Sequence, residues 1–148
     1  MQRCLEEALR RYPYNGTQKQ LLHVDLSRDF QFRGIPVLMQ HVVFNLLKNS
    51  IYYVLDAGKG SIHIWMEQQT EVNCLHFKDT GKGINSERLP YVFERFYSNR
   101  HNGTGIGLAF CKQVITQFGG SISCDSIEGE YTHFTLRFPR VEPANSTK

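Results

Sequence analysis

Hydrophobic residues in the middle of the chain recur with the period of an α-helix. Across residues 35–56 the apolar positions fall three or four residues apart, and the Gly-rich stretch 57–60 ends the run. This spacing predicts a long amphipathic helix. Residues 106–118 repeat the pattern before two glycines, and residues 4–12 form a short helical run that stops at Pro13.

Elsewhere apolar and polar residues alternate, which predicts strands. Four such stretches follow the long helix, at residues 62–66, 74–77, 121–124 and 132–138. The first two are separated by a short polar turn and predict a hairpin. Nearer the N-terminus, residues 21–26 and 30–32 predict two short strands joined by a turn. The segregated elements predict an α+β fold, a two-layer sandwich with about three helices on one face of a mixed sheet of about five strands.

Composition limits the class of protein. The chain has 148 residues, 41% of them hydrophobic and 21% charged, with a net charge of +3. We therefore expect one globular domain without a nucleic-acid or membrane surface of its own. No apolar stretch approaches the roughly 18 to 20 residues of a membrane-spanning helix, and the N-terminus is too charged for a secretory signal.

The four cysteines lack C-x-x-C spacing. They are interpreted as reduced, mostly apolar side chains of a cytoplasmic protein, neither a disulfide framework nor a zinc motif.

The long predicted helix carries two amides one turn apart, Asn45 and Asn49. The oxygen of an Asn side chain is a hard ligand that suits Mg²⁺, an ion that otherwise keeps waters and binds substrate phosphates. Taken alone, the pair also fits a solvated polar face opposite the apolar stripe, shared with His41, Asp56 and a tyrosine.

Two glycine-rich segments follow. Residues 79–84, Asp-Thr-Gly-Lys-Gly-Ile, come directly after a predicted strand, where a carboxylate can accept a hydrogen bond from an exocyclic amine and glycines let the backbone approach a planar base. Residues 103–108, Gly-Thr-Gly-Ile-Gly-Leu, open a helix, where free backbone N–H groups favour an anion such as a triphosphate. Between them lies the aromatic cluster Phe-Glu-Arg-Phe-Tyr at 93–97.

The order of these four features resembles the ATP-binding catalytic domain of bacterial sensor histidine kinases, in the superfamily that includes type II topoisomerase, Hsp90 and MutL ATPase domains. Residues 41–54, HVVFNLLKNSIYYV, resemble the N box, residues 79–84 the G1 box, residues 93–97 the F box and residues 103–108 the G2 box. The resemblance covers nearly the whole chain.

The resemblance implies the Bergerat α/β sandwich, ATP and Mg²⁺ as cofactors, and roles for particular residues. Asn49 would bind Mg²⁺ with Asn45 as its partner, Tyr53 would stack near the adenine, and Asp79 would accept a hydrogen bond from the adenine amino group. Residues 85–103 would form a mobile ATP lid. The remaining nucleotide-binding positions are Gly81, Gly83, Ile84, Gly103, Thr104, Gly105, Ile106, Gly107, Leu108 and Thr132.

Two departures from the family pattern stand out. Tyr52 occupies a position where many relatives carry a basic residue that reaches the phosphates, and Tyr131 stands where many have Gly before the strand Thr. Because a tyrosine cannot supply this positive charge, another basic side chain is expected to neutralise the phosphates during catalysis. The candidates are Arg95, Arg100, His101 and Lys48.

Asn45 also bears on the reaction. Hydrolytic relatives use a carboxylate at this position to activate water, and an amide cannot accept a proton at neutral pH. We therefore expect transfer of the ATP γ-phosphate to a histidine, as in two-component signal transduction. An ATP-binding regulatory module without transfer activity and a hydrolytic clamp ATPase are the alternatives.

None of the six histidines is followed by an acidic residue, as the family's phosphorylated histidine commonly is. The acceptor is therefore expected on a separate dimerisation domain, and a response regulator downstream. Residues 1–15 are interpreted as a remnant helix or linker from that domain, residues 16–140 as the catalytic domain, and residues 141–148 as a flexible tail. The catalytic domain is expected in the cytoplasm, either in a cytoplasmic protein or in the cytoplasmic portion of an inner-membrane sensor.

Overall fold

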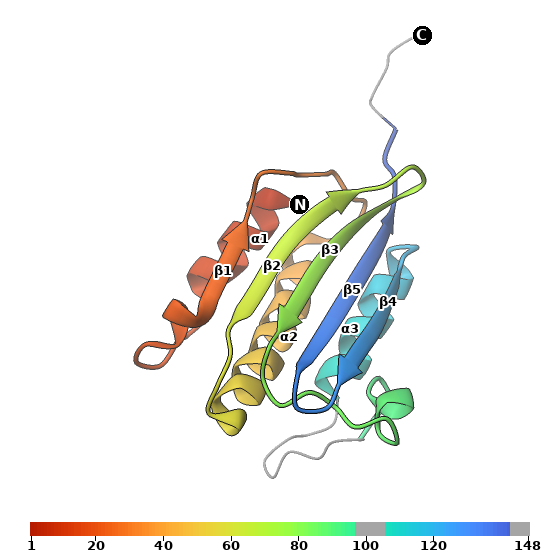
Figure 1. Ribbon diagram of the computed structural model, residues 1–148. Coiled ribbons are helices and arrows are strands. Elements are labelled where there is room, and N and C mark those ends of the chain that lie inside the picture. The colour runs from red at the N-terminus through yellow and green to blue at the C-terminus, as the bar shows by residue number, and fades with distance from the viewer. Residues whose placement is uncertain (97–105, 143–148) are drawn as a thin grey trace, which may run out of the picture.

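The computed structural model describes residues 1–96 and 106–142 (Figure 1). In these ranges the α-helices are α1 (Gln2–Arg11), α2 (Pro36–Ala57) and α3 (Gly107–Gln117). The strands are β1 (Leu22–Asp25), β2 (Ile62–Gln68), β3 (Val72–Asp79), β4 (Ser121–Ile127) and β5 (Tyr131–Pro139). Two short 3₁₀-helices, η1 (Gln18–Leu21) and η2 (Leu89–Tyr91), complete the described elements.

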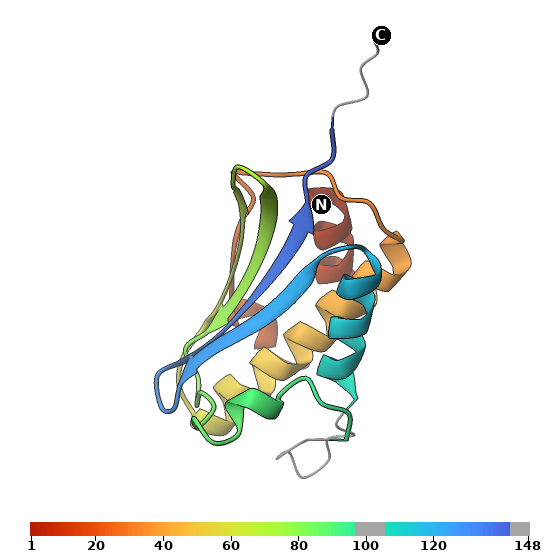
Figure 2. The ribbon, with the colours of Figure 1, turned by 90° about the vertical axis from the view of Figure 1, so that its right-hand side faces the viewer.

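The strands form one mixed sheet in the order β1-β2-β3-β5-β4. β1 runs parallel to β2, and the other neighbouring pairs are antiparallel. Figure 2 shows the three helices on one side of the sheet. The predicted two-layer α+β sandwich, its hairpin and its last two strands are confirmed.

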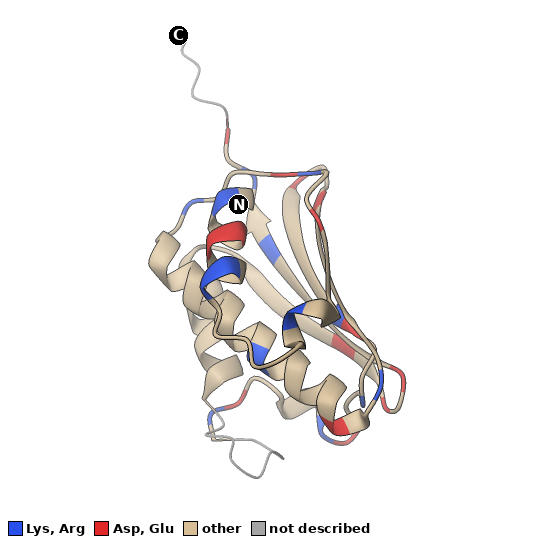
Figure 3. Ribbon diagram, turned by 90° about the vertical axis from the view of Figure 1, so that its left-hand side faces the viewer, with Lys and Arg blue, Asp and Glu red and all other residues tan. Residues whose placement is uncertain are grey.

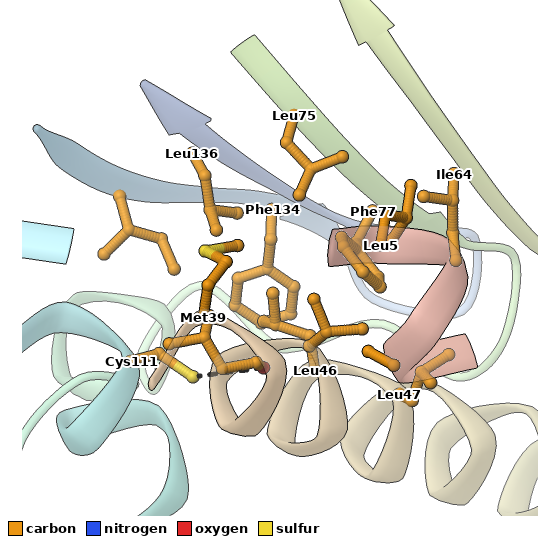
Figure 4. Close-up of a cluster of buried hydrophobic side chains, with 14 of the residues drawn as sticks. Leu5, Met39, Leu46, Leu47, Ile64, Leu75, Phe77, Cys111, Phe134 and Leu136 are labelled. Carbon is orange, nitrogen blue, oxygen red and sulfur yellow. Dashed lines mark hydrogen bonds between the residues drawn. The ribbon is translucent and has the colours of Figure 1, made fainter. Parts of the chain in front are cut away.

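The long helix α2 supplies much of the core. It starts with Pro36 in its first turn and ends at Gly58, whose positive φ of 66° suits a left-handed C-cap. Leu46 and Leu47 of this helix are fully buried, as are Phe77 and Phe134 of the sheet (Figure 4). The predicted helix is confirmed, and its apolar period arises because one side of it packs on the sheet.

Helix α1 belongs to the same core. Leu5 and Ala8 are fully buried in the main apolar cluster, and α1 packs along α2. A boundary at residue 15 therefore does not coincide with a break in packing. That α1 continues a helix of a preceding domain stays a prediction.

The predicted strand at residues 30–32 is wrong. The chain between β1 and α2 has no regular structure, and Phe30 and Phe32 each lie with ring centroids 5.5 Å from Phe138. Their alternation reflects burial against the end of β5 instead of pairing with a neighbouring strand.

Charge is spread over the molecule in mixed sign. Figure 3 shows basic and acidic residues interspersed along α1 and over the sheet. Among the described residues no helix is both long and apolar enough to cross a membrane.

Candidate functional site: a nucleotide-binding edge

Most of the predicted site residues gather where β3 ends beside the second half of α2. Asp79 closes β3 and pairs directly with Thr132 at the start of β5. The turn after Asp79 packs on α2, since a Cβ built on Gly81 would lie 2.6 Å from the carbonyl oxygen of Tyr53. Only a glycine allows this approach. Asn49 lies one helical turn before Tyr53 on α2.

Asp79 is fully buried beside this turn. Its Oδ1 accepts a hydrogen bond from the Gly81 N–H at 3.1 Å, whereas Oδ2 is buried without a hydrogen-bond partner in the described part of the chain. Burial raises the pKa of Asp79 to about 7, and the hydrogen bond from the Gly81 N–H opposes this rise. A buried acceptor without a partner is costly in free energy and calls for a donor from a ligand.

Asn49 is buried as well, with 6% of its surface exposed. Its Nδ2 has no hydrogen-bond partner within residues 1–96 and 106–142, and neither does the hydroxyl of the adjacent Ser50. Asn49 therefore does not lie on a solvated polar face, the alternative interpretation of the asparagine pair, although Asp56 further along α2 is exposed. The segment after β3 packs on this half of α2, where Tyr53, Ile84 and Val92 form a second apolar cluster with Leu108 packed against it.

Backbone and hydroxyl contacts fix the glycine turn to α2 and to the sheet. Lys82 N–H donates to the Tyr53 carbonyl at 3.3 Å, and Gly83 adopts a positive φ of 68°. The Ile84 N–H donates to Ser126 Oγ at 2.8 Å, and Ser126 Oγ in turn donates to the Tyr131 carbonyl. Sequence reasoning missed Ser126, although its register opposite Thr132 on β4 and β5 places it at the same edge.

Helix α3 presents its N-terminus to this edge. Ile106 is its N-cap and makes no side-chain capping bond within the described residues, and the first backbone N–H groups of an α-helix have no partner inside the helix and suit an anion. A Cβ on Gly107 would lie 2.8 Å from Asn45 Oδ1, and Asn45 Nδ2 donates to the His41 carbonyl at 2.9 Å. The helix N-terminus therefore lies against the first of the two asparagines.

We expect Gly107→Ala to reveal this contact in stability measurements. In an Asn45→Ala background the added methyl has room, and the higher helix propensity of Ala should stabilise the protein by up to about 1 kcal/mol. In the wild-type background the clash with the Asn45 amide should cancel or reverse that effect. Urea unfolding of the four proteins gives the coupling energy, and additivity within about 0.5 kcal/mol would contradict the contact.

The structure does not identify which basic side chain would neutralise the phosphates. Lys48 and Arg95 are exposed, and Arg100 and His101 lie outside the described residues together with Gly103, Thr104 and Gly105. Lys82, which the sequence did not single out, forms an ion pair with Asp56 at 3.0 Å and lies 4.7 Å over the Tyr52 ring.

Tyr131, the second departure from the family pattern, points away from the site. The Tyr131 hydroxyl donates to Asp125 at 2.8 Å, and Lys78 lies 4.8 Å from the centre of the Tyr131 ring. Asp125 and Lys78 lie on the sheet face that points away from the helices, because Cys124 and Phe77 beside them pack into the core. The tyrosine side chain therefore does not fill the space next to Thr132.

Comparison with known proteins agrees with this geometry. Residues 34–142 match the family model described as histidine kinase-, DNA gyrase B- and HSP90-like ATPase. The chain is 38% identical over 140 residues to the CAI-1 autoinducer sensor kinase/phosphatase CqsS of Vibrio cholerae, covering 93% of this chain and 20% of that protein. It is 33% identical over 135 residues to the sensor protein SrrB of Staphylococcus aureus, covering 87% of this chain and 21% of that protein. The chain thus spans about a fifth of the length of these curated relatives.

Solved structures share the fold. The mycobacterial sensor histidine kinase MprB superposes with a TM-score of 0.74 at 24% identity, covering 95% of this chain and 94% of that one. The catalytic domain of the histidine kinase ThkA gives a TM-score of 0.75 at 20% identity, covering 95% and 92%. With its fold, its ordered motifs and these matches, the chain belongs to the histidine kinase-, DNA gyrase B- and HSP90-like ATPase family, as an ATP-binding domain homologous to part of the sensor histidine kinases.

Proposed function

We propose that this chain binds Mg-ATP at the edge formed by α2, the end of β3 and α3, and transfers the γ-phosphoryl group to a histidine on another domain. The observation that carries the proposal is the buried Asp79 Oδ2, which has no hydrogen-bond partner among the described residues. An adenine amino group donates a hydrogen bond of the kind this oxygen lacks.

Asn49 is the residue we assign to Mg²⁺. Its side chain is buried at the same edge, and its oxygen Oδ1 is the atom that would bind the ion, whereas the unpartnered Nδ2 is a hydrogen-bond donor. A bound Mg²⁺ would neutralise phosphate charge. The uncapped N-terminus of α3 would hold phosphate oxygens with its backbone N–H groups, which compensates for the absence of a basic side chain at Tyr52.

Asn45 favours transfer over hydrolysis. Its amide nitrogen is held by the His41 carbonyl, and an amide cannot take a proton from water at neutral pH. The chain therefore offers no general base at this position, so an incoming acceptor must supply the nucleophile.

The acceptor is assigned to another domain because the histidines of the sheet point the wrong way. His23, His63, His76 and His133 alternate with core residues and lie on the face away from the helices, whereas Asp79 is on the helix-covered side. In the parent protein the phosphorylated histidine would pass its phosphoryl group to a response regulator. We place the domain on the cytoplasmic side of a sensor kinase.

A mixing assay tests the proposal. The purified chain, γ-labelled ATP and Mg²⁺ are combined with a separately expressed histidine phosphoacceptor domain. We expect acid-labile label on the acceptor and none on the chain alone. ATP binding without transfer would support a regulatory module instead, and rapid ATP hydrolysis without acceptor would support a clamp ATPase.

A further inference from the structure

The sheet face opposite the helices is the one turned toward the viewer in Figure 1. It carries a connected set of polar and aromatic side chains. Its members on β2, β3 and β5 are Trp65, Glu67, Cys74, His76 and His133. The Trp65 ring stacks on His76 with 4.6 Å between centroids and 9° between planes. His76 is only 8% exposed and Cys74 is 1% exposed, although both point away from the helices.

Three ligand atoms on this face lie close enough to share one metal ion. Glu67 and Cys74 pair directly across β2 and β3, and His76 follows two residues later on the same face. The carboxylate oxygen, the thiol sulfur and a ring nitrogen lie within 4.8 Å of one another. Metal–ligand bonds of about 2.0 to 2.3 Å place tetrahedral ligand atoms roughly 3 to 4 Å apart, so small side-chain rotations complete the arrangement.

His76 is already oriented as a metal-binding histidine. Its Nε2 faces Glu67 Oε1 at 2.9 Å, and its Nδ1 lies 2.9 Å from His133 Nε2. When Nε2 binds an ion, the ring proton stays on Nδ1, and this N–H donates a hydrogen bond to His133 Nε2. Metal-bound histidines characteristically donate their second N–H to such a partner, which fixes the tautomer and the ring orientation.

We propose that Glu67, Cys74 and His76 form a Zn²⁺ site on the outer face of the sheet. A thiolate, an imidazole and a carboxylate are the ligand types that zinc takes in proteins, whereas Mg²⁺ prefers oxygen ligands. The two anionic ligands balance the charge of the ion, and water completes the tetrahedron. The Glu67 side chain is 46% exposed, which gives the ion access from solvent.

No spacing motif in the sequence indicates this site. Its ligands come from two strands and meet only because the register pairs position 67 with position 74. The site also lies on the opposite side of the sheet from Asp79 and α2, so it is separate from the proposed Mg-ATP site.

Metal titration of the tag-free chain after chelator treatment tests the proposal. We expect one Zn²⁺ per chain in competition with a chelating dye, and a Co²⁺ derivative with a thiolate charge-transfer band and strong visible absorption typical of tetrahedral sites. Cys74→Ser and Glu67→Gln should each weaken Zn²⁺ binding by about 100-fold or more, and His133→Phe, which removes only the supporting partner, by about 10- to 100-fold.

Matched controls lie on the same molecule. His23→Ala with His63→Ala removes the other stacked histidine pair of this face, and Cys124→Ser removes a thiol elsewhere, so all three changes should leave zinc affinity intact. Circular dichroism and ATP affinity check that each variant is folded. The proposal is overturned if Cys74→Ser binds Zn²⁺ like the wild type, if the control variants lose it, or if wild-type Co²⁺ shows no thiolate band.

Discussion

Replacing Asp79 by Asn should stabilise the nucleotide-free protein at pH 8 and at the same time remove most of its affinity for ATP. The folded protein holds the pKa of Asp79 at about 7 because the carboxyl is buried, against 3.8 for an unperturbed Asp. At pH 8 the buried carboxylate is ionised in the folded state, which lowers stability by an amount on the order of 4 kcal/mol. The neutral amide of Asn avoids that penalty.

The pH dependence has a definite sign. Below pH 3.8 the carboxyl is protonated in both the folded and the unfolded chain, so Asp79 contributes no pH-dependent term. As pH rises from 3.8 to about 7, the unfolded chain releases the proton while the folded protein keeps it, and stability is lost. The advantage of Asp79→Asn should therefore grow over this window and level off above pH 7.

ATP affinity should change in the opposite direction. The single oxygen of Asn can keep the hydrogen bond from the Gly81 N–H, and its NH₂ group then faces the adenine amino group, donor against donor. Loss of a hydrogen bond to a charged group, about 1.5–3 kcal/mol, combined with this repulsion predicts about 100-fold weaker binding or more.

Urea unfolding at pH 4, 6 and 8, with and without Mg-ATP, measures both effects. Asp56→Asn is the matched control, because Asp56 is exposed and pairs only at the surface with Lys82. It should change stability little at any of these pH values and leave ATP affinity unchanged. An Asp79→Asn effect on stability that does not vary with pH, or unaltered ATP affinity, would refute the role of this carboxyl.

The sequence predicted the fold well because its strongest signals are local. The apolar period of α2 and the alternation of β2 and β3 depend only on which side of an element faces the core. By contrast, Phe30 and Phe32 show the same alternation for another reason, since they cover the end of the core beside Phe138. Periodicity reports burial, and burial does not require a strand.

The sequence predicted which residues form the site and their order along the chain. It did not predict what surrounds them. Tyr53, one turn after Asn49 on α2, is buried because the segment after β3 folds back and packs Ile84 and Val92 against it. The contact of Asn45 with Gly107 joins two helices far apart in sequence. Such placements follow from tertiary packing and strand register, which no single segment encodes.

Asn49→Ala should abolish phosphoryl transfer while leaving the nucleotide-free protein about as stable as before. The substitution removes a buried amide nitrogen that has no partner among the described residues, which relieves about 1–3 kcal/mol of desolvation penalty and offsets the lost packing. Loss of a group that stabilises phosphate charge predicts a transfer rate lower by about 100- to 1,000-fold. Raising Mg²⁺ should restore part of the lost rate, because removal of a ligand weakens binding of the ion and a higher concentration compensates by mass action.

Asn73→Ala separates this role from the general effect of deleting a buried amide. Asn73 is 5% exposed, and its Oδ1 also lacks a hydrogen-bond partner within the described ranges, yet it lies near the start of β3, whereas Asp79 ends that strand. Both alanine variants should show similar urea midpoints without nucleotide. Only Asn49→Ala should lose the stabilisation that Mg-ATP provides and the label transferred to the acceptor. Equal transfer by the two variants would mean that the unsatisfied amide of α2 is a packing defect and that the metal is held elsewhere.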